Sequence, residues 1–261
     1  MPRVPLPADF LRRPLAHRAY HDRAAGRPEN SRAAVKAAVD AGYGIEIDLQ
    51  LSLDGVAMVF HDDDLNRLTM DAGPVRARTA AQLSAIRLRD SIEGIPTFAE
   101  ILSIVAGKVP LLVEIKDQHD PDHTPMGPVV GKLEAAAAAD LAGYRGPVAV
   151  MSFNPNSVAE MARLAPDVPR GITTWEYPQD NSEGLSPEVC DHLRAIPDYD
   201  RCDASFVSHH WLDLDRPRLA ELRTQGAAIL CWTIRSAQDE AVARKGADNM
   251  TFEGYPANVH V

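Results

Sequence analysis

Apolar and polar positions along the chain follow two alternating patterns. Runs with the character of β-strands occur at residues 14–17, 43–50, 55–60, 110–116, 147–151, 168–173, 203–207, 227–232 and 248–252. Four helical segments lie between them. The first runs from about residue 30 to 41, the second begins at about residue 97, the third is alanine-rich and ends near residue 141, and the fourth covers 155–164. This alternation predicts a parallel sheet with crossover helices. About eight strands in 261 residues predict a (β/α)8 TIM barrel, which ordinarily needs roughly 250 residues, as one domain over residues 1–261.

Two stretches depart from the alternation. Residues 62–96 are irregular and polar, with one short helical piece near residues 79–86, and they predict a small insertion after the second strand region. The last strand-like run ends nine residues before the end of the sequence, at residue 252 of 261, which leaves little room for an eighth outer helix. We expect the N-terminal segment to cover that gap.

Composition and charge narrow the class of partner. The chain is 45% hydrophobic and 25% charged, which is ordinary for a soluble protein, and its formal net charge is −10. Such a charge disfavours nucleic acid and anionic membranes, because both attract basic surfaces. A phosphate-containing substrate is still compatible, since a divalent cation and a few basic side chains reverse the sign locally.

The sequence also bears on location. It contains no apolar run of about 18 residues, and the N-terminal segment has no apolar run of about 7–15 residues, so we expect neither a membrane span nor a secretory signal. Three cysteines, Cys190, Cys202 and Cys231, lack metal-ligand spacing and favour a reducing compartment. We therefore expect a cytoplasmic protein, and the sequence does not indicate its oligomeric state.

Charged residues stand within two of the apolar strands. Glu46 and Asp48 are two apart, so they point to the same face of their strand, as do Glu114 and Lys116 on another. Carboxylates that face a barrel interior are unfavourable unless they are compensated. Three of them suit a hard divalent cation, Mg²⁺ or Ca²⁺, while Lys116 could neutralise a phosphate. The alternatives are solvent-facing acids on a half-exposed strand and an internal Glu–Lys ion pair without a substrate.

Two histidines follow strand-like runs. His17 comes at the end of the first run and is followed by Arg18, and His61 directly follows the run at 55–60. Catalytic groups of barrels lie where strands end, and imidazoles there can act as general acid and general base. Either histidine alone would more often be structural, but the pair favours function. Arg18 offers a planar fork for phosphate oxygens.

The first helix begins with Glu29, Asn30 and Ser31. Asn30 or Ser31 could cap the helix, and Glu29 could reach a metal site or orient a group within it.

The motifs resemble those of the glycerophosphodiester phosphodiesterase family. The segments LAHRAYHDRAAGRPENS, IEIDLQLSLDGVAMVFHDDDLNRLT, VEIK, MSF and CWTI are similar to that family in order and content, from about residue 14 to residue 252. The resemblance implies a TIM barrel and metal-dependent hydrolysis of glycerophosphodiesters to glycerol 3-phosphate and an alcohol. It implies metal ligation by Glu46, Asp48 and Glu114, acid–base roles for His17 and His61, and phosphate contacts from Arg18 and Lys116.

The sequence departs from the family pattern at three places. Ala19 stands where the family usually has glycine, and it would be strained by roughly 1 kcal/mol if the backbone there needs a positive φ. The loop 19–28 is longer than the common form, and we expect it to contact the alcohol side of the substrate or to remain a solvated loop. Glu253 stands near the place of an acid in the family's closing motif.

Two other functions remain open from the sequence. A phospholipase D-like enzyme acting on lysolipids or sphingolipids would need an apolar groove, for which Trp175, Tyr177 and Trp211 are the available loop aromatics. A catalytically silent protein that binds a phosphodiester would be favoured by loss of a histidine or a carboxylate, and none is lost. The sequence does not indicate the head group, the metal, the nucleophile or which histidine is the acid.

Overall fold

The computed structural model describes residues 3–118, 124–178, 182 and 184–259. Its strands are β1 (Leu15–Ala16), β2 (Gly44–Leu51), β3 (Ala57–Val59), β4 (Leu111–Ile115), β5 (Val148–Ser152), β6 (Arg170–Thr174), β7 (Phe206–His210), β8 (Ala228–Ile234) and β9 (Asn249–Phe252). Its helices are α1 (Asp9–Arg12), α2 (Arg32–Ala41), α3 (Ala80–Ala85), α4 (Phe98–Val105), α5 (Lys132–Leu141), α6 (Pro155–Leu164), α7 (Pro187–Ala195), α8 (Pro217–Thr224) and α9 (Ala237–Ala243).

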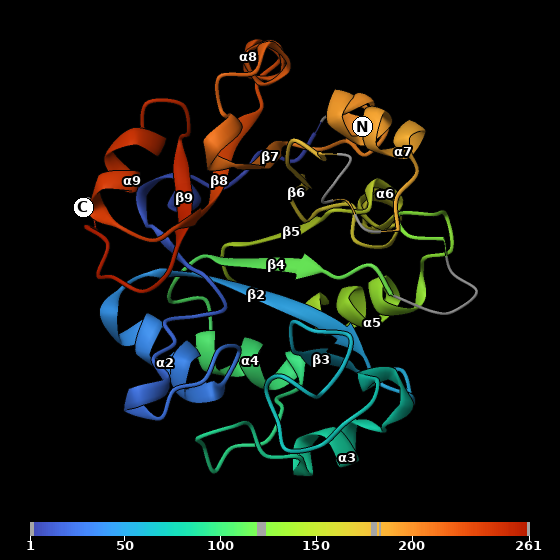
Figure 1. Cartoon of the computed structure of the whole chain (residues 1–261), viewed down its shortest axis with the longest axis vertical. Coiled ribbons are helices and arrows are strands. Elements are labelled where there is room, and N and C mark those ends of the chain that lie inside the picture. The colour runs from blue at the N-terminus through green and yellow to red at the C-terminus, as the bar shows by residue number, and fades with distance from the viewer. Residues whose placement is uncertain (1–2, 119–123, 179–181, 183, 260–261) are drawn as a thin grey trace.

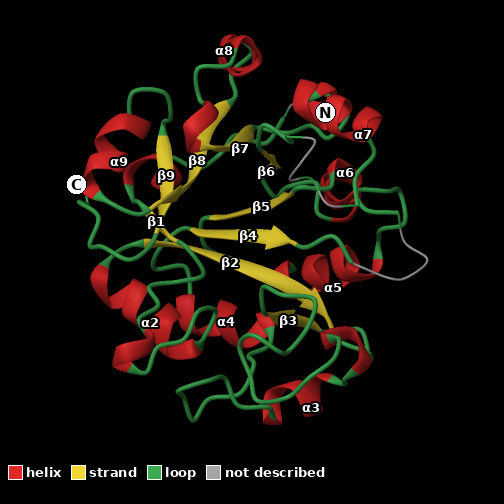
Figure 2. Ribbon diagram, in the orientation of Figure 1, coloured by secondary structure: helices red, strands yellow, loops and turns green. Residues whose placement is uncertain are grey.

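The strands close into a parallel barrel with the helices outside, as Figures 1 and 2 show. Pairing runs from β1 through β2, β4, β5, β6, β7, β8 and β9 and returns to β1, and each of these pairs is parallel. The predicted (β/α)8 TIM barrel is therefore confirmed. The strand predicted at 203–207 lies three residues later, at Phe206–His210, because Asp203 adopts a left-handed conformation (φ 47°) before the strand begins.

One of the predicted strands stays outside the barrel. β3 pairs antiparallel with the far end of β2, with Leu49 opposite Val59 and Leu51 opposite Ala57. β2 runs past the barrel mouth, and β3 returns beside it. The insertion that follows packs on β3 and forms a small core of its own, which includes Phe60, Leu65 and Leu83. Its short helix α3, expected near residues 79–86, is capped by Thr79.

The N-terminal segment closes the end of the barrel at which the parallel strands begin. It does not cover a gap in the outer layer of helices, so that expectation was wrong. Phe10, on α1, is fully buried among inward-facing side chains, including Leu112, Phe206 and Leu230. Asn249, at the start of β9, donates hydrogen bonds to the carbonyls of Phe10 and Arg13 and fixes the segment there. A helix this short cannot supply an outer layer, but one aromatic ring fills the opening between strand ends.

The C-terminal tail covers the outside of β9 instead. The hydroxyl of Tyr43 donates to the carbonyl of Ala257 at 2.8 Å, and Ala257 is buried. The rings of Tyr43 and Tyr255 both pack against Phe252, with centroids 4.8 and 5.6 Å away. Aromatic side chains thus provide the apolar cover that an eighth helix would otherwise give.

We expect Phe10→Ala to lower the free energy of unfolding by about 3–5 kcal/mol, because it removes a large ring from a closed apolar space. Leu11→Ala is the matched control, since Leu11 is 40% exposed, and it should change stability by less than about 0.5 kcal/mol. Urea unfolding of the three proteins measures both values. A loss of less than about 1 kcal/mol for Phe10→Ala would show that the segment does not contribute to the core.

Candidate active site

Three carboxylates meet at the mouth of the barrel. Glu46 and Asp48 project from β2, and Glu114 projects from β4, where it lies in register with Asp48. One oxygen of each lies within 4.8 Å of the others, and all three residues are buried. The strand spacing predicted from the sequence therefore places them on one interior face.

Basic and amide groups compensate two of these carboxylates. Lys116 Nζ lies 2.8 Å from Glu114 and 3.8 Å from Asp48, and Asn30 donates to Asp48 at 2.9 Å. Burial would raise the pKa of Asp48, but the charges of His61, Lys116 and Arg18 together with the Asn30 hydrogen bond lower it to about 2. Burial likewise opposes the charge of Lys116, yet the neighbouring carboxylates raise its pKa. Both groups are therefore ionised at neutral pH.

Glu46 is compensated less. It accepts a hydrogen bond from the backbone N–H of Arg18 at 2.9 Å. Burial, followed by the charges of Asp48 and Glu114, holds the pKa of Glu46 well above its ordinary value. The residues fit a hard divalent cation, because one oxygen from each of three carboxylates converges and the charge of Arg18 offsets that of Glu46 only in part.

His17 follows β1 at a tight turn. Its N–H donates to Phe252 O, and Arg18 and Ala19 then adopt left-handed conformations with φ of 50° and 65°. This turn directs the N–H of Arg18 to the carboxylate of Glu46. The departure at Ala19 therefore falls where the backbone has a positive φ, and the Ala19 side chain is buried there.

A carboxylate fixes the His17 ring. His17 Nδ1 lies 2.5 Å from Glu253 Oε2, and Glu253 also lies 3.5 Å from His21 Nε2 and 2.8 Å from Arg235. Burial lowers the pKa of His17 more than the hydrogen bond to Glu253 raises it. Burial would raise the pKa of Glu253, but hydrogen bonds from both histidines hold it far below its ordinary value. A charged Glu253 thus faces Nδ1 of a neutral His17.

His61 reaches the mouth by a different route from the one we expected. It does not end a parallel barrel strand, because β3 is antiparallel; it arrives because β3 returns beside β2 to the level of Asp48, where Phe60 N–H donates to Asp48 O. His61 Nδ1 lies 2.7 Å from Asp62, and His61 Nε2 lies 3.2 Å from Lys116 Nζ. Both histidines therefore have a carboxylate at Nδ1.

The start of α2 supports Arg18. Ser31 caps the helix by accepting from Ala34 N, which leaves the Asn30 side chain for Asp48. Glu29 lies 2.8 Å from the Arg18 guanidinium and also binds Arg67. The sequence left two roles open for Glu29, reaching a metal site or orienting a group within it. Its contacts with Arg18 and Arg67 fit the second role.

All seven residues singled out from the sequence line one cavity of about 230 Å³: His17, Arg18, Glu46, Asp48, His61, Glu114 and Lys116. The rest of its lining consists of Met151, Phe153, Thr173, Trp232, Thr233, Arg235 and Thr251, four of which belong to the MSF and CWTI motifs, although the sequence predicted no role for any of them. These are mostly uncharged residues near strand ends, which carry no sequence signal of chemistry.

The loop 19–28 and the aromatic residues of the loops lie outside the lining of the cavity. No residue of the loop 19–28 lines it; only His21 comes close, through Glu253, while Asp22 caps a short turn and Arg23 pairs with Asp90. Trp175, Tyr177 and Trp211 do not line it either, and Tyr177 is buried. The groove that a lipid substrate would need is therefore not formed by these aromatics.

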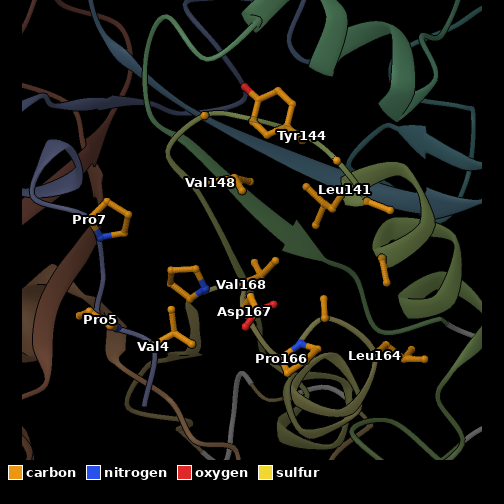
Figure 3. Close-up of a pocket in the computed structure, with 16 residues that line it drawn as sticks. Val4, Pro5, Pro7, Leu141, Tyr144, Val148, Leu164, Pro166, Asp167 and Val168 are labelled. Atoms are coloured by element: carbon orange, nitrogen blue, oxygen red, sulfur yellow. The ribbon is translucent and has the colours of Figure 1, made fainter. Parts of the chain in front are cut away.

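A second hollow lies at the opposite end of the barrel and has a different character (Figure 3). It measures about 570 Å³ and is formed by the N-terminal segment and the ends of α5 and α6, with apolar side chains such as Leu141, Val148 and Leu164. Among its lining residues, Asp167 is the only charged one. Because it lacks paired acids and bases and lies at the N-terminal strand ends, catalysis is assigned to the mouth.

Comparison with known proteins identifies the family. The sequence profile of the glycerophosphoryl diester phosphodiesterase family matches residues 17–251. The chain belongs to this family. It is a phosphoric diester hydrolase, in agreement with the resemblance seen in its motifs.

Relatives and solved structures agree with the family. The Bacillus subtilis protein YhdW, provisionally named a glycerophosphodiester phosphodiesterase, is 27% identical over 250 residues, which cover 93% of this chain and 94% of YhdW. The glycerophosphodiester phosphodiesterase of Caldanaerobacter subterraneus is 29% identical over 153 residues, covering 56% and 60%. An Oleispira antarctica phosphodiesterase, solved with the product sn-glycerol-3-phosphate, has the same fold, with a TM-score of 0.69, 24% identity and 93% and 92% coverage.

In the part of the chain that the structure describes, no helix is both long and apolar enough to cross a membrane.

We expect Glu46→Gln to stabilise the metal-free protein at pH 8. A raised folded-state pKa means that the folded protein keeps a proton that the unfolded chain has released, so stability is lost as pH rises from the ordinary glutamate pKa through the raised one. The amide removes this loss and should raise the free energy of unfolding at pH 8, with a smaller difference at pH 5. Urea unfolding in chelator at both values measures it.

Mg²⁺ or Ca²⁺ should stabilise the wild type in the same experiment and should have little effect on Glu46→Gln, because a neutral amide is a weaker ligand. A variant that is less stable than the wild type at pH 8 in chelator would contradict the unfavourable charge assigned to Glu46.

Proposed function

We propose that this protein hydrolyses a small glycerophosphodiester to glycerol 3-phosphate and an alcohol with the help of one divalent cation, Mg²⁺ or Ca²⁺. The observation that carries the proposal is the single cavity that contains both the carboxylate cluster of Glu46, Asp48 and Glu114 and the histidines His17 and His61. A cavity that only bound a phosphodiester would not need two imidazoles, each oriented by a carboxylate.

The carboxylates and the basic residues have complementary tasks. Glu46, Asp48 and Glu114 would hold the cation, which when bound supplies Lewis-acid stabilisation of charge on the phosphoryl oxygens. Arg18 lies between Glu29 and Asp48 and presents its guanidinium to the same cavity, and Lys116 lies between Glu114 and His61. Both would bind phosphoryl oxygens, whose negative charge increases as the new bond forms.

The histidines would move the protons. Glu253 and Asp62 each bind the Nδ1 of one histidine, so each histidine would use Nε2 toward the reacting groups; the Nε2 of His61 lies 3.2 Å from Lys116 Nζ. One imidazole takes the proton of the attacking oxygen as the oxygen–phosphorus bond forms. Attack by water gives glycerol 3-phosphate directly, whereas attack by the glycerol hydroxyl gives a cyclic phosphodiester that a water molecule must then open. The other gives its proton to the alkoxide as the phosphorus–oxygen bond to the leaving alcohol breaks.

We further propose that the barrel acts as one domain over residues 1–261, in the cytoplasm, on a free small molecule rather than on nucleic acid. The clusters of buried residues pack on the two faces of one closed sheet or on β3, which supports one unit. Cys190, Cys202 and Cys231 are buried free thiols, which suits a reducing compartment.

The wild-type protein should release glycerol 3-phosphate from glycerophosphodiesters in Mg²⁺ or Ca²⁺ and lose that activity in chelator, because the carboxylate cluster would then face the substrate phosphate without the positive charge of the cation. A coupled assay for glycerol 3-phosphate over a panel of head groups measures this. Full activity in chelator would contradict the cation, and binding of the diester without release would favour a silent binding protein.

His17→Ala and His61→Ala should each lower kcat by about 100-fold or more, the usual size of acid–base effects, while cation affinity changes little. Glu253→Gln should lower kcat by about tenfold through His17, so combining it with His17→Ala should cause no further loss. Glu176→Gln is the matched control, because Glu176 binds Nδ1 of His210 at 3.0 Å and neither residue lines the cavity. Near-normal turnover in both histidine variants would show that other groups transfer the protons.

A further inference from the structure

Arg67, in the insertion after β3, lies outside the lining of the cavity but is held firmly next to it. It belongs to a turn in which Leu65 and Leu68 are buried in the insertion's own small core. The N–H of Thr69 donates to Leu65 O at 3.0 Å, and the guanidinium of Arg89 donates to Arg67 O at 3.0 Å. The backbone that carries the Arg67 side chain is therefore fixed by apolar burial and by hydrogen bonds.

The guanidinium of Arg67 binds two carboxylates, one at each of its donor edges. Its Nε and Nη2 donate to the two oxygens of Asp62, both at 2.7 Å. Its Nη1 and Nη2 donate to the two oxygens of Glu29, at 2.9 and 2.8 Å. Paired hydrogen bonds of this kind are strong and specific in geometry. The Glu29 and Asp62 side chains are only 13% and 21% exposed, so water weakens these pairs less than ordinary surface ion pairs.

These contacts complete a ring of polar side chains around one side of the carboxylate cluster. In order, its members are Arg67, Glu29, Arg18, Asp48, Lys116, His61 and Asp62. Arg67 joins the two arms of this ring outside the cavity. One arm leads through Glu29 to Arg18, which the proposed function places on the phosphate. The other leads through Asp62 to His61, which the proposed function makes a proton carrier.

We propose that Arg67 is a positioning residue that fixes Arg18 and His61 relative to one another. This role rests on the function proposed above and gives the insertion a part in the reaction. Because a guanidinium is planar, the carboxylates bound to its two edges have a fixed separation and orientation. A lysine ammonium keeps the charge but has no such edges, so charge alone does not replace Arg67.

Arg67→Lys should lower kcat by about tenfold and raise the dissociation constant of glycerol 3-phosphate by about threefold, because displaced supporting groups misplace both His61 and Arg18. Turnover of a glycerophosphodiester in Mg²⁺ measures the first effect. Calorimetry with glycerol 3-phosphate measures the second and needs no turnover. The melting temperature should stay close to that of the wild type, since the charge is kept. Arg67→Ala should give losses at least as large.

Two further backgrounds separate the arms of the ring. In Glu29→Gln the arm to Arg18 is already weakened, so Arg67→Lys should no longer affect binding of glycerol 3-phosphate but should still lower kcat. In Asp62→Asn the arm to His61 is weakened, so Arg67→Lys should still affect binding but should lower kcat by less than about threefold. General damage to the fold would not divide the two effects in this way.

Arg23→Lys is the matched control. Arg23 also binds a carboxylate of the insertion, that of Asp90, and both side chains are more than half exposed. Neither residue belongs to the ring or lines the cavity, so kcat and the binding of glycerol 3-phosphate should equal those of the wild type.

Normal kcat and product binding in Arg67→Lys would overturn the positioning role, because charge alone would then suffice. Equal losses in the wild-type, Glu29→Gln and Asp62→Asn backgrounds would also overturn it, because Arg67 would not be acting through those carboxylates. Either result leaves the hydrolase intact. A folded wild type that releases no glycerol 3-phosphate in Mg²⁺ or Ca²⁺ would instead refute the proposed function, and the positioning role would fall with it.

Discussion

The crowding of three carboxylates inside the barrel is the constraint on which the rest of the site depends. A buried negative charge is tolerated only with nearby positive charge or hydrogen-bond donors. Lys116 and Asn30 meet this need at Glu114 and Asp48, and a backbone N–H meets part of it at Glu46. The remaining imbalance is what a divalent cation would relieve, so the feature that destabilises the empty site is also what would give it affinity.

The backbone around the mouth follows from this constraint. The left-handed turn at Arg18 and Ala19 directs one N–H to Glu46 and sends the Arg18 side chain toward Asp48 and Glu29. The overshoot of β2 and the return of β3 place His61 beside Lys116. Each irregular segment delivers a donor to a carboxylate, which is why strain is acceptable there.

The two ends of the barrel divide stability from function. At the end where the strands begin, Phe10 fills the interior with apolar contacts and takes no part in catalysis. At the mouth, the buried carboxylates detract from stability but leave oxygens that could bind a cation. The parallel barrel permits this division, because its strand carboxyl ends all open onto one face.

The sequence by itself determined the barrel, the insertion and the seven residues named for the site, because period-two strands and charges inside apolar runs are local patterns. It could not determine how His61 reaches the mouth, since the direction of β3 depends on pairing with β2. It also assigned the N-terminal segment to the wrong surface, because a four-residue helix with one buried ring has no periodicity to show which space it fills. The sequence also predicted no role for Thr173 or Thr251, because they line the cavity only when distant strands enclose it. Chemistry carried by neighbouring residues can be read along the chain, whereas enclosure and unsatisfied hydrogen bonds exist only after the chain has folded.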